Sequence, residues 1–326
     1  MNFPQNAYLL GFVGALLGSA ISLPLWRAWC ERTGLVDDPG QRKIHATPIP
    51  LAGGLAVFTG MLIVILGGCA AIKLRLLDPV AVDRLAYGFG KRAWEIASIL
   101  LGGVGMLVLG WWDDRHELRP AWKLLGQVAV ASLVAAAGVR VTLFVPSIAF
   151  SFLVTALWIV TVTNAFNLSD NMNGLCGGLA CIAAAAFTVH AGLHGEYLVA
   201  SLSAVTCGAT LGFLPFNFPR ASVFLGDAGS HLIGYMLSVL AILPHFYSSK
   251  FHDPRPWAVL IPVIVLIVPL ADLATVTITR TLAGKPFWVG DTNHLSHRLV
   301  RAGLSRPRAV MVLWLAGLIA GLSVLA

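Results

Sequence analysis

The chain has 326 residues, of which 57% are hydrophobic and only 11% are charged, and its formal net charge is +7. A soluble domain carries roughly 25% charged residues, so this composition excludes a soluble globular protein. Several apolar stretches reach the ~20 residues that a helix needs to cross a bilayer. We therefore predict an all-α, polytopic transmembrane helical bundle, with residues 1–326 forming a single integral-membrane domain.

Ten apolar stretches are predicted to span the membrane as helices. Only helices and closed barrels satisfy their backbone hydrogen bonds in lipid, and these stretches are too long for barrel strands. The eighth span is short, and Pro269 is a candidate break in the ninth. The span cores are residues 7–26, 51–72, 95–112, 122–139, 147–165, 175–193, 197–214, 229–243, 257–279 and 308–326.

The loops between these spans carry an uneven charge. The odd-numbered loops hold most of the 22 Lys and Arg residues, which places those loops in the cytoplasm and both termini outside. This bias accounts for the positive charge, so no nucleic-acid partner is expected. Ten of the 15 acidic residues fall on the same side. Acidic residues contribute little to topology, so their clustering points to function.

Loops one and three both offer groups suited to phosphate chemistry. In loop one, Arg42, Lys43 and His45 could bind phosphate or simply anchor the topology. In loop three, Asp113 and Asp114 are adjacent carboxylates that can hold Mg²⁺, or supply a base and the group that orients it. Lys123 and Gln127 follow one helical turn apart. The alternative for loop three is an ordinary charged membrane boundary with interfacial tryptophans.

Loop five runs over residues 164–174 and contains no Lys or Arg. A cytoplasmic loop without a basic residue is not there to set topology. Its amide and carboxylate groups suit recognition of a base or sugar, or the outer shell of a metal. The leading candidates are Asn167, Asp170 and Asn173.

Loop seven places Phe224 and Gly226 before Asp227, at the predicted start of a helix. Free N–H groups at a helix start favour anions, and glycine lets a ligand approach the backbone closely. A carboxylate at this point suits a Mg²⁺–phosphate site. The alternative is that Asp227 only caps the helix.

Loop nine carries His294, His297 and Arg298, which form one phosphate-binding surface if the segment is helical. A zinc site is not favoured, because no cysteine accompanies these residues. Asp272 lies inside the ninth predicted span, three residues after Pro269. An ionisable residue there is a functional candidate by default, unless it merely reaches water near the cytoplasmic end.

Taken together, the five odd loops resemble the polyprenyl-phosphate N-acetylhexosamine-1-phosphate transferases, the glycosyltransferase family 4 enzymes of the undecaprenyl-phosphate GlcNAc-1-phosphate transferase type. The resemblance runs in order from Asp38 to His297. It rests on D-P-x-x-R-K-x-H, G-x-x-D-D, N-A-x-N-L-x-D, G-D-x-G-S, P-x-x-D and the His-containing ninth loop.

The resemblance implies a Mg²⁺-dependent phosphoglycosyltransferase, with Mn²⁺ as the alternative ion. Its substrates would be a UDP-N-acetylhexosamine, with GlcNAc preferred, and an undecaprenyl or decaprenyl phosphate. The products would be UMP and a polyprenyl-diphosphate sugar, which starts cell-envelope polysaccharide synthesis, for example of lipopolysaccharide. The enzyme would be a multi-pass protein of the bacterial inner membrane with its active site on the cytoplasmic face. Homodimer formation is left open.

The resemblance also implies roles for individual residues. Asp227 corresponds to the metal ligand. Asp113, Asp114 and Lys123 form the catalytic group beside the lipid phosphate. Asn167, Asp170, Asn173 and Phe224 would bind the nucleotide, and His294, His297 and Arg298 would lie on the diphosphate side. His45 and Asp272 are further candidates.

Two positions depart from the family pattern: Asn173 stands where the family usually has Asp, and Ser296 where it usually has His. Three alternatives remain. They are phospho-N-acetylmuramoyl-pentapeptide transferase, whose ninth loop has three adjacent His residues, a membrane transporter, and an inactive scaffold.

Overall fold

The computed structural model describes residues 4–39, 47–76, 82, 90, 92–141, 145, 147–244, 256–286 and 292–325. Within these ranges the chain is almost entirely helical. The helices are α1 (Gln5–Thr33), α2 (Gly53–Lys73), α4 (Ala93–His116), α5 (Pro120–Ala136), α6 (Ile148–Ser169), α7 (Leu175–Leu193), α8 (Tyr197–Asn217), α9 (Gly226–Ile242), α10 (Ile261–Val265), α11 (Ile267–Leu282), α12 (Leu295–Arg301) and α13 (Arg306–Ser323).

Each of the ten predicted spans coincides with helical structure, which confirms a helical membrane bundle. In the described ranges, seven helices are long and apolar enough to cross a membrane. They are α1, α2, α4, α6, α7, α8 and α13. Helices α5 and α9 have 17 residues each. At 1.5 Å per residue each is about 26 Å long, slightly less than a hydrocarbon core of ~30 Å.

The ninth predicted span is broken, but not at Pro269. A short 3₁₀ helix, η1 (Pro256–Leu260), leads into α10, and the chain then bends by 71° at Leu266 before α11 begins. Pro269 lies inside the first turn of α11, where the missing N–H of proline breaks no helical hydrogen bond. If the bent pair crosses the membrane as one unit, it is an eighth span.

Helix α9 is the central helix of the bundle. Every residue from Ala228 to Ala241 is buried, because α4 and α6 pack along it and α2, α7 and α8 add further contacts. A helix that is apolar all round belongs in a core. This position explains how the shortest predicted span stays helical although it is short for a lipid-exposed helix.

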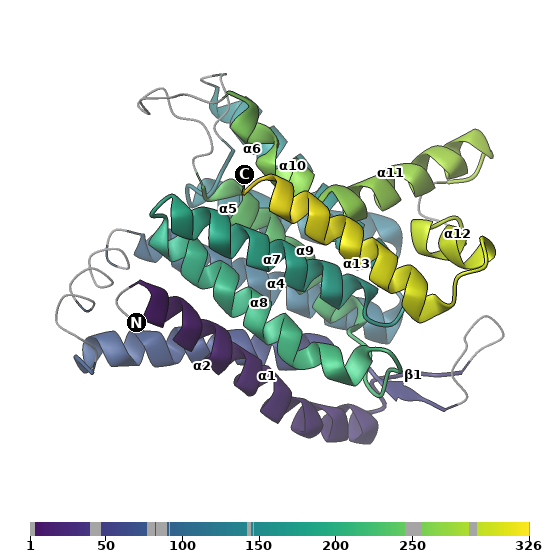
Figure 1. Cartoon of the computed structure of the whole chain (residues 1–326), viewed down its shortest axis with the longest axis horizontal. Coiled ribbons are helices and arrows are strands. Elements are labelled where there is room, and N and C mark those ends of the chain that lie inside the picture. The colour runs from purple at the N-terminus through teal and green to yellow at the C-terminus, as the bar shows by residue number, and fades with distance from the viewer. Residues whose placement is uncertain are drawn as a thin grey trace.

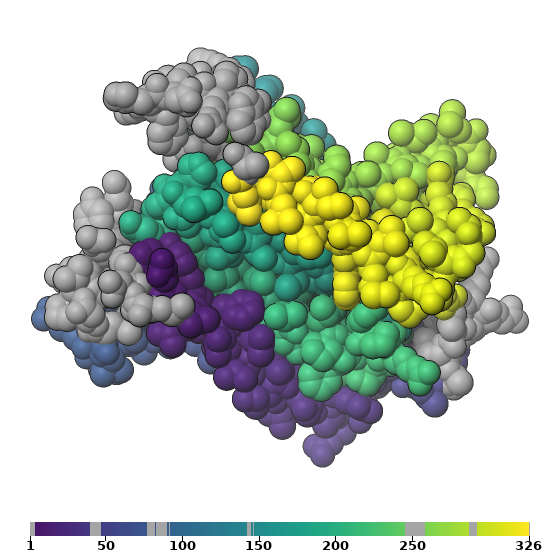
Figure 2. Space-filling view, in the orientation of Figure 1, coloured from purple at the N-terminus to yellow at the C-terminus, as the bar shows by residue number. Residues whose placement is uncertain are grey.

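The outer helices present apolar side chains to their surroundings. Figure 2 shows α1, α8, α7 and α13 as neighbouring diagonal bands on one face. Large exposed hydrophobic residues on the two outermost bands include Leu17, Ile21, Leu25, Leu315, Ile319 and Leu322. Such faces are expected to contact lipid, since a water-soluble monomer rarely exposes large apolar patches.

The described residues at the two ends of loop one pair with each other and contact loop seven. Strand β1 (Val36–Asp37) pairs antiparallel with β2 (Ile49–Pro50), with Val36 opposite Pro50. Phe224 N–H then donates to the carbonyl of Pro50 at 2.9 Å, and Gly53 N–H donates to the carbonyl of Phe224 at 2.9 Å. In Figure 1, β1 and α12 lie at one end of the molecule and both chain termini lie towards the other.

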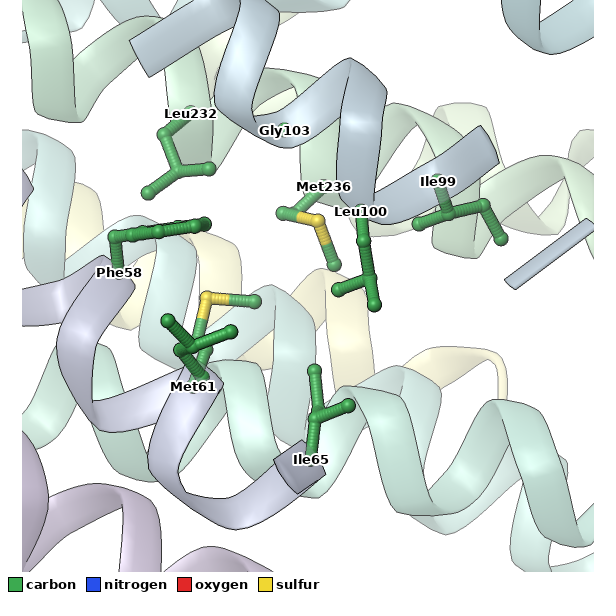
Figure 3. A pocket seen from close by; sticks show the side chains of 9 residues that line it. Phe58, Met61, Ile65, Ile99, Leu100, Gly103, Leu232 and Met236 are labelled. Atoms are coloured by element: carbon green, nitrogen blue, oxygen red, sulfur yellow. The ribbon is translucent and has the colours of Figure 1, made fainter. Parts of the chain in front are cut away.

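A small apolar gap lies among side chains of α2, α4 and α9 (Figure 3). Its lining is made by Phe58, Met61, Leu62, Ile65, Ile99, Leu100, Gly103, Leu232 and Met236. Because the lining is apolar, this gap offers no group that could bind a polar ligand. The polar residues predicted to form the functional site lie instead at the ends of the helices.

Candidate active site

Four helix ends bring five of the predicted site residues together. Asp113 and Asp114 lie at the end of α4, Lys123 in the first turn of α5, Asn167 near the end of α6 and Asp227 in the first turn of α9. These residues come from loops three, five and seven. The spatial cluster therefore joins segments that are more than 100 residues apart in sequence.

Lys123 is the centre of this cluster. Its Nζ lies 2.7 Å from Asp113 Oδ2 and 2.8 Å from Asp227 Oδ2, and it donates to Asn167 Oδ1 at 3.2 Å. Helix α5 begins at Pro120, directly after the extended residue Arg119, and proline is favoured at the first position of a helix. This start places Lys123 in the first turn, next to the end of α4. One ammonium group thus pairs with carboxylates from two different helices, and its single positive charge offsets only one of their two negative charges.

Asp114 has a different environment from its neighbour Asp113. Its Oδ1 accepts from Asp227 N–H at 2.8 Å and its Oδ2 accepts from Ala228 N–H at 3.0 Å. It therefore caps the N-terminus of α9 with a negative charge, which the helix dipole favours. Gly226 adopts φ +73°, and a Cβ there would lie 2.8 Å from Asp114 Oδ2. Only glycine fits this turn without strain.

The structure thus separates the two adjacent carboxylates. Asp114 uses both oxygens to hold the start of α9. Asp113 accepts from Leu118 N–H with Oδ1 at 2.8 Å, and its Oδ2 faces Lys123. Of the pair, Asp113 is the one whose reactive oxygen lies at the cluster.

Two amide side chains fix the other members of the cluster. Asn167 Nδ2 donates to Asp227 Oδ1 at 2.8 Å and to Ser230 Oγ at 2.9 Å. One turn deeper on α5, the buried Gln127 accepts through Oε1 from Asn164 Nδ2 at 2.6 Å. Helices α5, α6 and α9 are therefore joined by polar contacts at their ends and, between α5 and α6, one turn deeper.

The oxygens around Lys123 form a set that suits a hard cation. Asp113 Oδ2, Asp227 Oδ2 and Asn167 Oδ1 all lie within hydrogen-bond distance of one ammonium nitrogen. Among the described residues, no three or more His, Cys, Asp or Glu side chains form a ready-made metal cage. Mg²⁺ commonly takes one or two carboxylates and completes its shell with water and substrate phosphates, so this donor set fits it.

Asp170, which follows the end of α6, has a pKa that responds to the negative charge of the cluster. Burial raises the pKa of Asp170, and the negative charges of Asp227 and Asp114 raise it further. Its carboxyl group therefore keeps its proton to a higher pH than a free Asp. Excess negative charge near Asp227 is a feature that a bound cation would relieve.

The other nucleotide-side candidates lie in neighbouring turns. Asn173 is partly exposed, and its Nδ2 makes a long, 3.4 Å hydrogen bond to the carbonyl of Pro219. Phe224 lies two residues before the start of α9 and is joined through its backbone to Pro50 and Gly53.

Loop nine forms a second polar cluster. Asp272, 5% exposed, accepts from His294 Nδ1 at 2.8 Å and from Leu295 N–H at 2.6 Å. The predicted helix begins only after His294, and the His297 ring centroid lies 6.0 Å from that of His294. Asp272 does not stand alone in its span as an isolated charge; it anchors the start of α12.

The remaining members of loop nine differ in their surroundings. Partial burial lowers the pKa of His297, and the nearby charges of His294, Arg306 and Arg301 lower it further. Arg298 Nε donates to the carbonyl of Asn293 at 3.0 Å. His45 lies outside the described residues.

Several polar contacts could not be recognised from the sequence. The Asn164–Gln127 pair, the Ser230 hydroxyl and the bond from Ser296 Oγ to Asn171 Oδ1 at 2.6 Å all join different helices or loops. Asn164 and Ser230 lie within the sequence motifs, which was the only signal for them. Ser296 stood out only as a departure from the family pattern and Asn171 only as a member of loop five, and neither signal indicated their contact.

The fold and the site define a polytopic helical membrane protein with an acidic and amide-rich site at one set of helix ends. Residues 96–245 match the family model described as "Glycosyl transferase family 4". Together with the relatives below, this match shows that the chain belongs to that family.

The curated relatives are similar over nearly the whole chain. The "Probable undecaprenyl-phosphate N-acetylglucosaminyl 1-phosphate transferase" of Bacillus subtilis (strain 168) is 33% identical over 97% of this chain and 83% of its own length. The "Decaprenyl-phosphate N-acetylglucosaminephosphotransferase" of Mycobacterium tuberculosis (strain ATCC 25618 / H37Rv) is 34% identical over 94% and 79%. The "Undecaprenyl-phosphate alpha-N-acetylglucosaminyl 1-phosphate transferase" of Escherichia coli (strain K12) is 28% identical over 96% and 82%. None of these three names refers to a muramoyl-pentapeptide.

Proposed function

We propose that this protein transfers GlcNAc-1-phosphate from UDP-GlcNAc to a polyprenyl phosphate. An oxygen of the lipid phosphate forms a bond to the β-phosphorus of the nucleotide sugar. The bond from that phosphorus to the bridging oxygen breaks, and UMP leaves with this oxygen. The products are UMP and polyprenyl-diphosphate GlcNAc. The names of the three relatives support the lipid substrate and the sugar.

The observation that carries the proposal is the Asp113–Lys123–Asp227 cluster. Phosphoryl transfer depends mainly on charge neutralisation and in-line positioning, with little covalent chemistry for the protein to perform. Lys123, held between the two carboxylates, supplies a positive charge for a phosphate oxygen. Asp113 Oδ2 is the candidate base that takes the proton of the lipid phosphate. Asn167 keeps the Asp227 carboxylate oriented.

The donor set supports Mg²⁺ as the cofactor, held by Asp227 with Asp113 and Asn167 nearby. When bound, the ion would neutralise the diphosphate charge. Asp227 is in the first turn of α9, and Asp114 fixes that turn by accepting two of its N–H groups. The chain therefore positions its metal-binding carboxylate through a second carboxylate.

The nucleotide and diphosphate sides follow from the neighbouring loops. In this proposal Asn167, Asp170, Asn173 and Phe224 contact the uridine, and Phe224 packs on the uracil. His294, His297 and Arg298 contact the diphosphate. The Asp272–His294 bond supports this arrangement, because Asp272 accepts from Nδ1 and so leaves Nε2 free for another partner.

A purified preparation tests the function directly. The protein is incubated with Mg²⁺, polyprenyl phosphate and a panel of UDP-sugars, and the lipid product is identified by mass. We expect release of UMP and a polyprenyl-diphosphate N-acetylhexosamine with UDP-GlcNAc as the best donor. Absence of UMP release from every donor would leave the scaffold or transporter alternative.

We further propose that the site faces the cytoplasm, in keeping with the Lys and Arg distribution and a cytoplasmic nucleotide donor. In a cysteine-free protein, single cysteines at Asp38, Arg119, Arg220 or Ser305 should resist a membrane-impermeant maleimide in intact cells. A cysteine at His194, between α7 and α8, should react and serves as the control. Labelling at any of the first four positions would contradict a shared cytoplasmic site.

Asn173→Asp tests the main departure from the family pattern. If residue 173 only accepts a hydrogen bond from the uracil N3–H, the Asn carbonyl oxygen already does so, and Asp adds a charge-assisted bond. We expect KM for UDP-GlcNAc to change by about tenfold or less, equivalent to ~1.4 kcal/mol, with kcat and metal dependence nearly unchanged. Asn6→Asp, at the start of α1, is the matched control. An inactive native protein that Asn173→Asp switches on would instead support the scaffold.

A further inference from the structure

The turn at residues 170–174 in loop five is held by three other parts of the chain. Gly174, with φ +78°, donates its N–H to Asn217 Oδ1 at 2.6 Å and accepts from Trp314 Nε1 at 3.2 Å. Asn171 Oδ1 accepts from Ser296 Oγ at 2.6 Å. Helix α8, helix α13 and helix α12 thus each contribute one bond to the same short turn.

The Ser296 bond is placed to influence the turn strongly. Ser296 is 1% exposed, so water does not compete for its hydroxyl. Asn171 Nδ2 also donates to the carbonyl of Leu168 at 2.7 Å, which sets the amide so that Oδ1 faces Ser296. The bond joins residues 125 positions apart in sequence, and it connects a side chain of α12 directly to a side chain of the turn.

Helix α12 is itself fixed on its other side. Asp272 of α11 accepts from both His294 Nδ1 and Leu295 N–H at the start of α12. Ser296 follows directly after these two residues. A rigid connection therefore runs from α11 through the first turn of α12 to Asn171, which lies between Asp170 and the rest of the turn.

We propose that Ser296 is a positioning residue for nucleotide binding: through Asn171 it sets the 170–174 turn in the conformation that receives the uridine diphosphate. This inference rests on the proposed function, in which that turn contacts the nucleotide. Without the bond, the turn must be ordered when the nucleotide binds, and that entropy cost weakens binding. The Lys123 cluster lies on α4, α5, α6 and α9 and does not use this bond.

Ser296→Ala removes the hydroxyl and should raise KM for UDP-GlcNAc about five- to tenfold, the range expected for one buried hydrogen bond. KM for polyprenyl phosphate and kcat should change by less than about twofold, since uniform loss of nucleotide binding affects KM alone. Ser305→Ala is the matched control, because Ser305 is exposed and its side chain makes no capping bond. It should leave all three parameters unchanged.

A double-mutant cycle separates this role from a general loss of structure. Asn171→Ala removes the same bond from the other side, so adding Ser296→Ala to it should cause almost no further rise in KM. If Ser296→Ala does not fold, the single variant Asn171→Ala tests the same bond. Full additivity, or an equal rise in KM for both substrates, would overturn the proposal.

The same experiments distinguish the two levels of the argument. An active wild-type protein whose nucleotide KM is insensitive to Ser296→Ala would refute the positioning role and leave the transferase function intact. A wild-type protein that releases no UMP and does not bind UDP by calorimetry would refute the proposed function, and the role of Ser296 with it.

Discussion

Replacing Asp227 with Asn should abolish GlcNAc-1-phosphate transfer in a protein that still folds. The amide keeps the shape of the carboxylate but loses the charge that a hard cation requires. The substitution also puts two neutral amides next to each other, at residues 167 and 227, and leaves Asp113 as the carboxylate that pairs with Lys123. Loss of one such electrostatic group costs roughly 10²- to 10³-fold in turnover, and loss of a metal ligand at least as much. UMP release at saturating substrates is the measurement.

The control for this variant is Glu31→Gln, which removes one carboxylate from an exposed ion pair with Arg27 on α1. It should retain full activity. Thermal unfolding of Asp227→Asn should match that of the wild type closely enough to show that the bundle is intact. Turnover close to the wild-type value in such a folded variant would remove Asp227 as the metal ligand.

Asp113→Asn should lower kcat by about 10²-fold or more and leave KM for UDP-GlcNAc nearly unchanged. The loss belongs in kcat because the proposed role of this residue is to act as a base on the lipid phosphate, and general bases contribute roughly 10²- to 10⁴-fold. Asp113 Oδ2 is the oxygen of this residue that faces Lys123, so the change is made at the reacting end of the site. Initial rates over a matrix of both substrates separate the two parameters.

Asp114→Asn provides the informative comparison. It should also reduce turnover more than nucleotide affinity. It should in addition lower thermal stability, since the two N–H groups of α9 bond to different oxygens of Asp114 and one of them would face the NH2 group of the amide. Asp113→Asn should lower stability much less. Poor binding of UDP-GlcNAc with normal turnover in both variants would show that these carboxylates do not act on the lipid side.

The helices were largely predictable from the sequence because a helix that crosses a membrane requires a long run of apolar residues. All ten runs are helical, and the ends of α7 match the predicted range. The position of the bend in the ninth span was not predictable. The sequence suggested a break at Pro269, but the chain bends at Leu266, a residue type that is common inside helices. The short length of α9 was predicted, but its complete burial was not, since that depends on how the other helices surround it.

The site was predictable as a set of residues but not as a set of contacts. The loops that contain Asp113, Lys123, Asn167 and Asp227 could be identified because polar groups are rare in this chain. Which oxygen faces which partner depends on the rotation of each helix about its axis, which motifs do not specify. For this reason the division of labour between Asp113 and Asp114 required the structure.

Three glycines near the start of α9 have a consequence for how this protein can change over generations. A Cβ at Gly110 would meet the carbonyl oxygen of Asp227, and one at Gly54 would meet the backbone nitrogen of Gly229. At Gly54 and Gly110 the nearest atoms are backbone atoms of α9, so no side chain can repack around a larger residue there. A Cβ at Gly229 would meet both the Leu225 side chain and the backbone of Gly54. Selection on Gly54, Gly110 and Gly229 should therefore be as strict as on the carboxylates, although none of the three needs to touch a substrate.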